Sequence, residues 1–319
     1  MTSVSADKIS SFFDTPAPAI PFEIIGDKIT QARISKMINR IAASQTGRDV
    51  LETACKAGYA VGMEFVLGCN GGCSKEKKLI ILNPLSKDEE LIGVLVHEAR
   101  HAGQFVRGEY DASDDKRPRK ETLKTQIMRT RAVEADAQAT AVQTLGEMME
   151  AGDVTPLQVF SRANGAIGKA FSKAVYLEDD ALSSGAARTA AFMAWYENDA
   201  IKTAYDLAYQ VEMMQRRAKN GKNKEDTYSE SQSAEKIVSD LCLASDGTCY
   251  FKQDPAVLED RYFINVDRKT SDELNYLMKH SAPSAKDHPD NILPFLPRPR
   301  RTERQKTSLP LMKRFENVR

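Results

Sequence analysis

The hydrophobic positions near the start of the chain repeat with the period of an α-helix. Between residues 28 and 43, apolar side chains stand three or four residues apart, at Ile34, Met37, Ile38 and Ile41. This spacing places them on one face of a helix that packs against a core. A second helix is predicted over residues 49–57.

The pattern then changes to short apolar runs that are typical of β-strands. Residues 59–67 and 78–83 form two such runs, and the second ends before Pro84. The segment between them, residues 68–77, contains Asn-Gly and Gly-Gly pairs, which favour a tight turn. The two runs and this segment together predict a β-hairpin.

Two long helices are predicted after the hairpin. Ser86, with Glu89 three residues later, forms a capping-box pattern that starts a helix over residues 87–106. Residues 121–149 contain no proline and no glycine before Gly146, and their apolar positions again repeat with a helical period.

The C-terminal half is also predicted to be mainly helical. Its longest helical stretch covers residues 186–217, where we interpret the many aromatic positions as core packing, and a short strand is expected at residues 262–266. The fold class is therefore expected to be α+β and predominantly helical. A small β-hairpin or sheet would pack on the two long helices and be followed by a helical half.

Composition divides the chain into four expected parts. Residues 1–22 form a disordered leader, residues 23–150 the core with both long helices, residues 151–280 a mainly helical region, and residues 281–319 a Pro-rich basic tail. From Arg298 onward the tail has eight basic residues against two acidic ones. We expect this tail to be a disordered, solvated extension, and the alternative is that it contacts an acidic partner, a membrane or nucleic acid.

Charge and cysteine content narrow the class of protein. The 45 basic and 45 acidic residues balance, so the whole chain has no charge that would select nucleic acid or an anionic membrane. No apolar run of transmembrane or signal-peptide length occurs, and five cysteines, an odd number, fit reduced thiols. A cytoplasmic location is expected, with export without a cleaved signal left open.

Cys69 and Cys73 enclose the Asn-Gly-Gly segment of the predicted hairpin. We interpret this segment as the hairpin turn. Two alternatives are a redox-sensitive pairing of these two cysteines and a second metal site shared with Cys242 and Cys249, although the cysteine spacing departs from that of common zinc sites.

The first long helix contains the sequence His97-Glu98-Ala99-Arg100-His101, which is an HExxH motif. Residues four apart lie on the same helix face, so both imidazoles can bind one metal ion with Glu98 beside it. On a helical projection both histidines lie beside the apolar face, Glu98 lies on it, and Arg100 and Gln104 lie beyond the histidines on the solvent side. The alternative is a pair of half-exposed histidines on a surface helix.

The second long helix offers a third metal ligand. Glu134 falls within its apolar stripe, where a carboxylate is costly to bury without a partner such as a metal ion. The alternative is a buried ion pair or hydrogen bond, for example with Arg131. Asp136 projects nearly opposite to the stripe, so we expect it to lie in solvent.

The two motifs together resemble the gluzincin type of zinc metallopeptidase. In that type, two histidines of HExxH and a glutamate from a later helix hold the metal. The segments LVHEARHAGQ and RAVEADAQA are similar to a bacterial metallopeptidase-domain family of unknown function. The resemblance covers roughly residues 50–150 and extends to neither the leader nor the C-terminal half.

This resemblance implies that His97, His101 and Glu134 bind Zn²⁺ and that Glu98 is the general base. It also implies that the strand at residues 78–83 borders the cleft and pairs with an extended peptide. Gluzincins usually supply a further Tyr or His that hydrogen-bonds the developing oxyanion, and no motif identifies it here. The candidates are Tyr110, Tyr196, Tyr262, His280 and Arg131.

Two function classes follow from these observations. The first is a zinc-dependent peptidase that hydrolyses a protein or peptide by metal-activated water. The second is a catalytically silent zinc-site protein whose helical half and basic tail bind a partner. The sequence contains no recognisable specificity pocket, so it does not predict the substrate. It does not predict the oligomeric state either.

Overall fold

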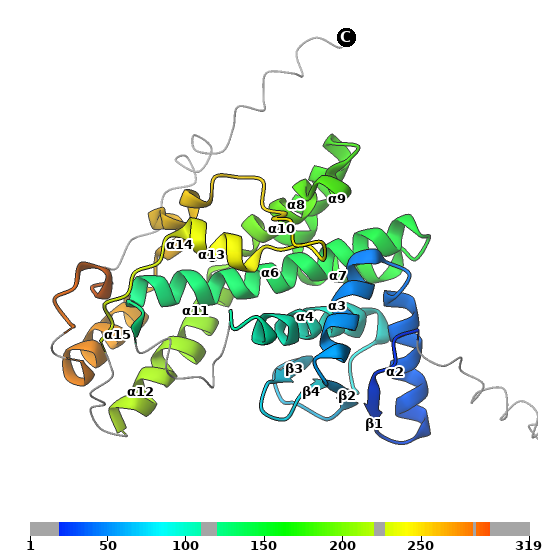
Figure 1. Ribbon diagram of the computed structural model, residues 1–319, viewed down its shortest axis with the longest axis horizontal. Helices are drawn as coiled ribbons and strands as arrows, with labels where there is room; N and C mark the ends of the chain where they lie inside the picture. The colour runs from blue at the N-terminus through cyan, green and yellow to red at the C-terminus, as the bar shows by residue number, and fades with distance from the viewer. Residues whose placement is uncertain (1–18, 110–119, 220–226, 283–284, 294–319) are drawn as a thin grey trace, which may run out of the picture.

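The computed structural model of the chain describes residues 19–109, 120–219, 227–282 and 285–293. In this part the chain forms one small sheet and many helices (Figure 1), so the α+β, predominantly helical class is confirmed. The N-terminal elements, in order, are β1 (Glu23–Ile25), α2 (Lys28–Ile41), α3 (Gln45–Lys56), β2 (Ala60–Met63), β3 (Gly71–Ser74), β4 (Leu79–Leu82) and α4 (Asp88–Val106).

The remaining helices follow the long helix α6 (Leu123–Glu150). They are α7 (Thr155–Ala163), α8 (Gly165–Leu177), α9 (Ala181–Ser184), α10 (Ala186–Trp195), α11 (Asp199–Tyr205), the π-helix η1 (Asp206–Val211), α12 (Glu212–Lys219), α13 (Ala234–Leu241), the 3₁₀-helix η2 (Pro255–Glu259), α14 (Arg261–Ile264), α15 (Arg268–Ser281) and the 3₁₀-helix η3 (Pro289–Asn291). The strand predicted at residues 262–266 is therefore wrong, because α14 occupies most of that segment. None of the described helices combines the length and apolar character needed to cross a membrane.

Side-chain caps explain where the early helices begin. Asp27 caps α2 and accepts from the backbone N–H of Thr30, while Ser44 caps α3 and accepts from that of Gly47. Helix α3 consequently begins four residues before the predicted start. The capping box predicted at Ser86 is wrong, because this hydroxyl donates to Asn70 Oδ1 instead and α4 begins without a side-chain cap.

The sheet differs from the predicted hairpin. Its strand order is β1-β2-β4-β3, and the two predicted strands, β2 and β4, are neighbours that run parallel. The segment predicted as a turn contains the third strand, β3, which pairs antiparallel with β4 and forms one edge of the sheet. The tight turn lies between β3 and β4, where Lys78 adopts a φ of 48°.

Gly71 explains why the Asn-Gly-Gly segment is a strand and not a turn. A Cβ atom at Gly71 would lie 2.5 Å from Val94 Cγ1 and 3.5 Å from Glu98 Cγ, both on α4. Only glycine lets the backbone approach a helix this closely. The edge strand β3 therefore lies directly against the part of α4 that contains the HExxH motif.

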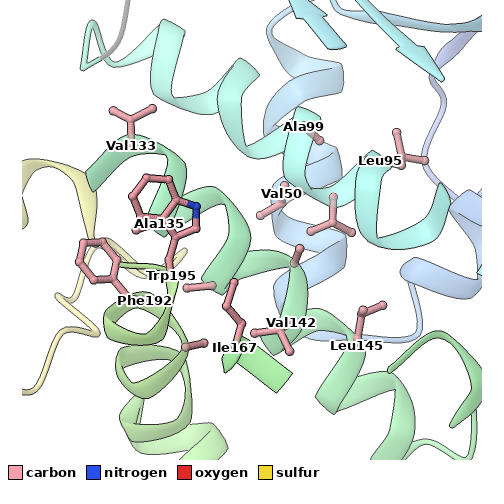
Figure 2. Close-up of a cluster of buried hydrophobic side chains, with 14 of the residues drawn as sticks. Val50, Leu95, Ala99, Val133, Ala135, Val142, Leu145, Ile167, Phe192 and Trp195 are labelled. Atoms are coloured by element: carbon pink, nitrogen blue, oxygen red, sulfur yellow. The ribbon is translucent and has the colours of Figure 1, made fainter. Parts of the chain in front are cut away.

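Helix α6 occupies the centre of the molecule (Figure 1). The sheet and α2–α4 lie on one side of it, and α8, α10, α13 and α14 lie on the other. Figure 2 shows side chains of α3, α4, α6, α8 and α10 meeting in one apolar cluster, among them Val50, Leu95, Val142, Ile167 and Trp195. Because α6 is covered by packed helices on both sides, nearly every one of its side chains is buried, polar ones included.

Candidate metal centre

The four residues predicted to form the site come from two adjacent helices. His97, Glu98 and His101 lie in the middle of α4, and Glu134 lies in α6, which packs against α4. The two histidine Nε2 atoms are 3.0 Å apart, and Glu134 Oε2 is 3.5 Å from each of them. In the described residues, these three side chains form the one group that could hold a metal ion.

The spacing of these three atoms suits a metal ion with short bonds to nitrogen and oxygen. Ligands at 2.0–2.2 Å from a tetrahedral zinc ion lie about 3.3–3.6 Å from one another. The observed separations of 3.0, 3.5 and 3.5 Å are close to these edges of a tetrahedron. Ca²⁺ prefers six to eight oxygen ligands, so a group of two imidazole nitrogens and one carboxylate suits it poorly.

Unpaired buried atoms support the same interpretation. Glu134 is 1% exposed, and its Oε2 atom has no hydrogen-bond partner among the described residues. Burial raises the pKa of Glu134, but His101 and His97 lower it by more, and the net pKa lies well below its usual value. A buried, ionised oxygen without a hydrogen-bond donor is costly, and a cation would remove that cost.

The charge of Glu134 also changes the pKa of His101. Burial lowers the pKa of this imidazole, whereas the Glu134 carboxylate raises it by more, to about 9. Metal binding at this group therefore displaces a proton at neutral pH. The arrangement favours a positive charge at this point, whether it is brought by a proton or by a metal ion.

Glu98 lies at the edge of a cleft of about 320 Å³. The cleft is bordered by α4, β3, α7 and Tyr205, and both His97 and Glu98 line it. Burial raises the pKa of Glu98, and Glu134 raises it further against the opposing effect of the two histidines.

The strand that borders the cleft is β3, and β4 is not free to pair with a peptide because it lies between β2 and β3. The prediction that residues 78–83 serve this purpose is therefore wrong.

Two tyrosines that the sequence analysis assigned to core packing lie at the site. Tyr209 donates to Glu134 Oε1 at 3.3 Å, and Tyr205 lies close enough to this carboxylate to feel its charge while lining the cleft. Their rings stack with centroids 5.6 Å apart. Burial and the nearby Glu134 charge raise the pKa of Tyr205, so its hydroxyl remains a proton donor.

The π-helix η1 fixes the position of these tyrosines. Asp206 accepts two hydrogen bonds from Arg131, at 2.5 and 3.1 Å, and Gln210 donates to Thr130 Oγ1 at 2.9 Å. These three hydrogen bonds join η1 to α6 one turn before Glu134. A π-helical turn is rare and is found mostly at functional sites. Tyr205 and Tyr209 are four residues apart, which places them on the same helix face. This spacing is the one sequence signal that could have indicated that both tyrosines lie near the same group.

Four of the oxyanion candidates chosen from the sequence lie within the described residues, and none of these four lines the cleft. Tyr196 is buried in an aromatic cluster, Tyr262 donates to the Tyr196 carbonyl, and Arg131 is paired with Asp206 rather than with Glu134. His280 is exposed, and its ring packs at a tilt against Tyr276 of α15. Tyr110 lies outside the described residues, as does the basic tail from Arg298 onward.

Three polar residues on the far side of the histidines are buried, not solvated. Asp136 is 0% exposed and accepts hydrogen bonds from Arg100 at 2.7 and 3.1 Å. Gln104, also 0% exposed, joins Asp136 to His101. The prediction that these residues face solvent is wrong, because a helical projection assumes one solvated face. The side chains of Arg100 and Gln104 contact α6, and Asp136 is covered by Arg188 and Tyr250.

The cysteine predictions also change. All five cysteines are free thiols, and Cys73 lies within β3 rather than at the end of a turn. Cys242 and Cys249 lie on neighbouring segments joined by the Leu243–Cys249 bridge. Within the described part of the chain, the cysteines form no group of three or more metal ligands.

Comparison with known families gives a match that covers most of the chain. Residues 18–251 match the family described as "Putative metallopeptidase family (DUF6782)". The chain belongs to this family. The match extends well beyond residues 50–150 and includes α7 to α13 and Tyr250, so the helical half belongs to the same family unit as the HExxH helix. No curated protein and no solved structure matches the chain.

Proposed function

We propose that this protein is a zinc-dependent peptidase that hydrolyses peptide bonds with Glu98 as general base. The observation that carries the proposal is the spacing of 3.0, 3.5 and 3.5 Å among His97 Nε2, His101 Nε2 and Glu134 Oε2, with Glu98 beside them in an open cleft. Membership in a metallopeptidase family supports it.

The residues divide the chemistry between them. A zinc ion, when bound by His97, His101 and Glu134, polarises a carbonyl and lowers the pKa of water. Glu98 takes the proton of the attacking water and passes it to the leaving amine, and its raised pKa suits both transfers. Residues 23–150 thus supply the ligands and the base.

The helical region supplies a hydrogen-bond donor for the transition state. Tyr205 lines the cleft beside His97 and Glu98, and its raised pKa keeps the hydroxyl protonated. We assign it the stabilisation of the oxyanion that forms at the scissile carbonyl, which needs a donor aimed at the site of developing charge. Tyr209 holds the Glu134 carboxylate in place.

The substrate binds as an extended peptide along β3. This strand is an edge strand, so one row of its backbone groups is available for pairing, and it passes Glu98 at Gly71. At Gly72 there is open space where a side chain would stand. A peptide that adds to this edge lies across the cleft with its carbonyl groups beside Glu98.

The test combines metal analysis with peptide cleavage. Wild-type protein should bind one zinc ion per chain and cleave an unstructured protein substrate. Glu98→Gln should keep the metal and lose activity by about 10²- to 10⁴-fold, because only the proton transfer is removed. Tyr205→Phe should lose about 10²- to 10³-fold in kcat with metal retained.

Tyr262→Phe is the matched control, since its hydroxyl donates to a backbone carbonyl away from the cleft. It should keep wild-type activity. Full turnover by Glu98→Gln would exclude the role given to Glu98. Zinc-loaded wild-type protein that cleaves no substrate would contradict the peptidase proposal while leaving the metal site in place.

A further inference from the structure

Gln104 connects a proposed metal ligand to the buried interior. Its Oε1 atom lies 2.7 Å from His101 Nδ1, and its Nε2 donates to the backbone carbonyl of Val133 at 3.1 Å and to Asp136 Oδ2 at 2.8 Å. A carbonyl and a carboxylate oxygen can only accept from this amide. The amide NH₂ must therefore face Val133 and Asp136, and the carbonyl must face His101.

This orientation selects one tautomer of His101. Because Gln104 Oε1 can only accept, Nδ1 must carry the proton, and Nε2 keeps its lone pair for the group formed with His97 and Glu134. Metal-binding histidines depend on such partners to fix ring orientation and tautomer.

Asp136 holds Gln104 in place from a fully buried position. Besides Gln104, it accepts from Arg100 of α4, from Arg188 of α10 at 3.3 Å, and from the Tyr250 hydroxyl at 2.7 Å. The Arg188 guanidinium lies 3.8 Å over the Tyr250 ring. Asp136 is therefore the point where the HExxH helix, the Glu134 helix and the helical half meet.

We propose that Gln104 and Asp136 are positioning residues that set the tautomer and orientation of His101 for the metal ion. Arg100, Arg188 and Tyr250 fix Asp136, so the segment that ends at Tyr250 contributes to metal affinity without touching the metal. The inference rests on the metal site of the proposed function, but it requires no peptidase activity.

The test compares two buried glutamines. Gln104→Met should weaken zinc binding by about 10- to 100-fold in competition with a chelating indicator, because the acceptor for His101 is lost. Gln143→Met is the matched control, since Gln143 is 4% exposed and bonds to Glu147 and the Leu182 carbonyl of another region. It should lose a similar amount of thermal stability and no zinc affinity. Equal zinc affinities of the two variants would overturn the inference.

A conservative variant separates positioning from packing. Gln104→Glu keeps an acceptor for His101 Nδ1, and the adjacent Asp136 carboxylate favours the protonated form of the new side chain, whose O–H replaces the amide donor to Asp136. It should bind zinc more tightly than Gln104→Met. Affinity as low as that of Gln104→Met would contradict the role of the acceptor.

Nitrogen NMR of the wild-type protein tests the tautomer even if Gln104→Met does not fold. In the zinc-loaded protein, and in metal-free protein at a pH where the His101 imidazole is neutral, the proton should reside on Nδ1, where Gln104 Oε1 accepts it. A proton on Nε2 would overturn the inference. Failure of the wild type to bind zinc would contradict the proposed function alone, because the metal-free spectrum still reports the tautomer.

Discussion

The α4–α6 pair has buried polar side chains on two sides, one facing the cleft and one facing the interior around Asp136. The two sides differ in how far these side chains are paired by hydrogen bonds. On the cleft side, His97 Nδ1 and Glu134 Oε2 are buried without hydrogen-bond partners among the described residues. On the interior side, Asp136 accepts hydrogen bonds from four different side chains. Natural proteins rarely leave buried polar atoms unpaired without a functional reason. The cleft side therefore leaves the Glu134 oxygen available to a ligand, and the hydrogen bonds to Asp136 maintain the geometry of the interior side.

The largest expected effect comes from removing Asp136, which lies at the centre of the interior side. Asp136→Ala leaves Arg100 and Arg188 buried without their shared carboxylate, so the free energy of unfolding of metal-free protein should fall by about 3–5 kcal/mol. His97→Ala, on the cleft side, should change it by less than about 1 kcal/mol while abolishing zinc binding. Denaturant unfolding of both metal-free variants checks the contrast, and equal losses of stability would remove it.

This contrast marks the limit of prediction from the sequence. His97, His101 and Glu134 could be found because each lies in a local helical pattern, and spacing within one helix fixes which side chains share a face. Asp136 and Gln104 were placed in solvent by the same reasoning. The burial of Gln104 depends on the packing of α4 against α6, and that of Asp136 also depends on Arg188 and Tyr250 from the helical half. A local pattern contains no information about a second layer of packing.

The sheet and the tyrosines show the same limit. Strand sequences predicted β2 and β4, but their parallel pairing depends on β3, whose position follows from the contact between Gly71 and α4. Tyr205 and Tyr209 resemble core aromatics in the sequence. Their position over Glu134 depends on the Arg131–Asp206 pair, which joins residues 75 apart.

A smaller effect concerns the pH dependence of the stability that His101, on the cleft side, contributes. In metal-free protein the pKa of His101 is raised from 6.5 to about 9 by Glu134 against the effect of burial. A raised folded-state pKa contributes stability that is complete below pH 6.5 and is lost as the pH rises through about 9. The loss should be roughly 3 kcal/mol, measured by unfolding of metal-free protein across this range. His101→Gln should show a flat profile there, and a flat wild-type profile would contradict the charge coupling between His101 and Glu134.

The smallest expected effect tests whether the two sides are linked at a distance. Tyr250→Phe removes one hydrogen bond to Asp136 and keeps the ring under Arg188, so the free energy of unfolding should fall by about 1–2 kcal/mol. Zinc affinity should fall by less than about tenfold, because Gln104 and both arginines still hold Asp136. Tyr262→Phe, which alters no contact of Asp136, should leave the affinity unchanged. If Tyr250→Phe lost stability but kept full zinc affinity, the segment around Tyr250 would support only the fold, and the metal site would depend on α4 and α6 alone.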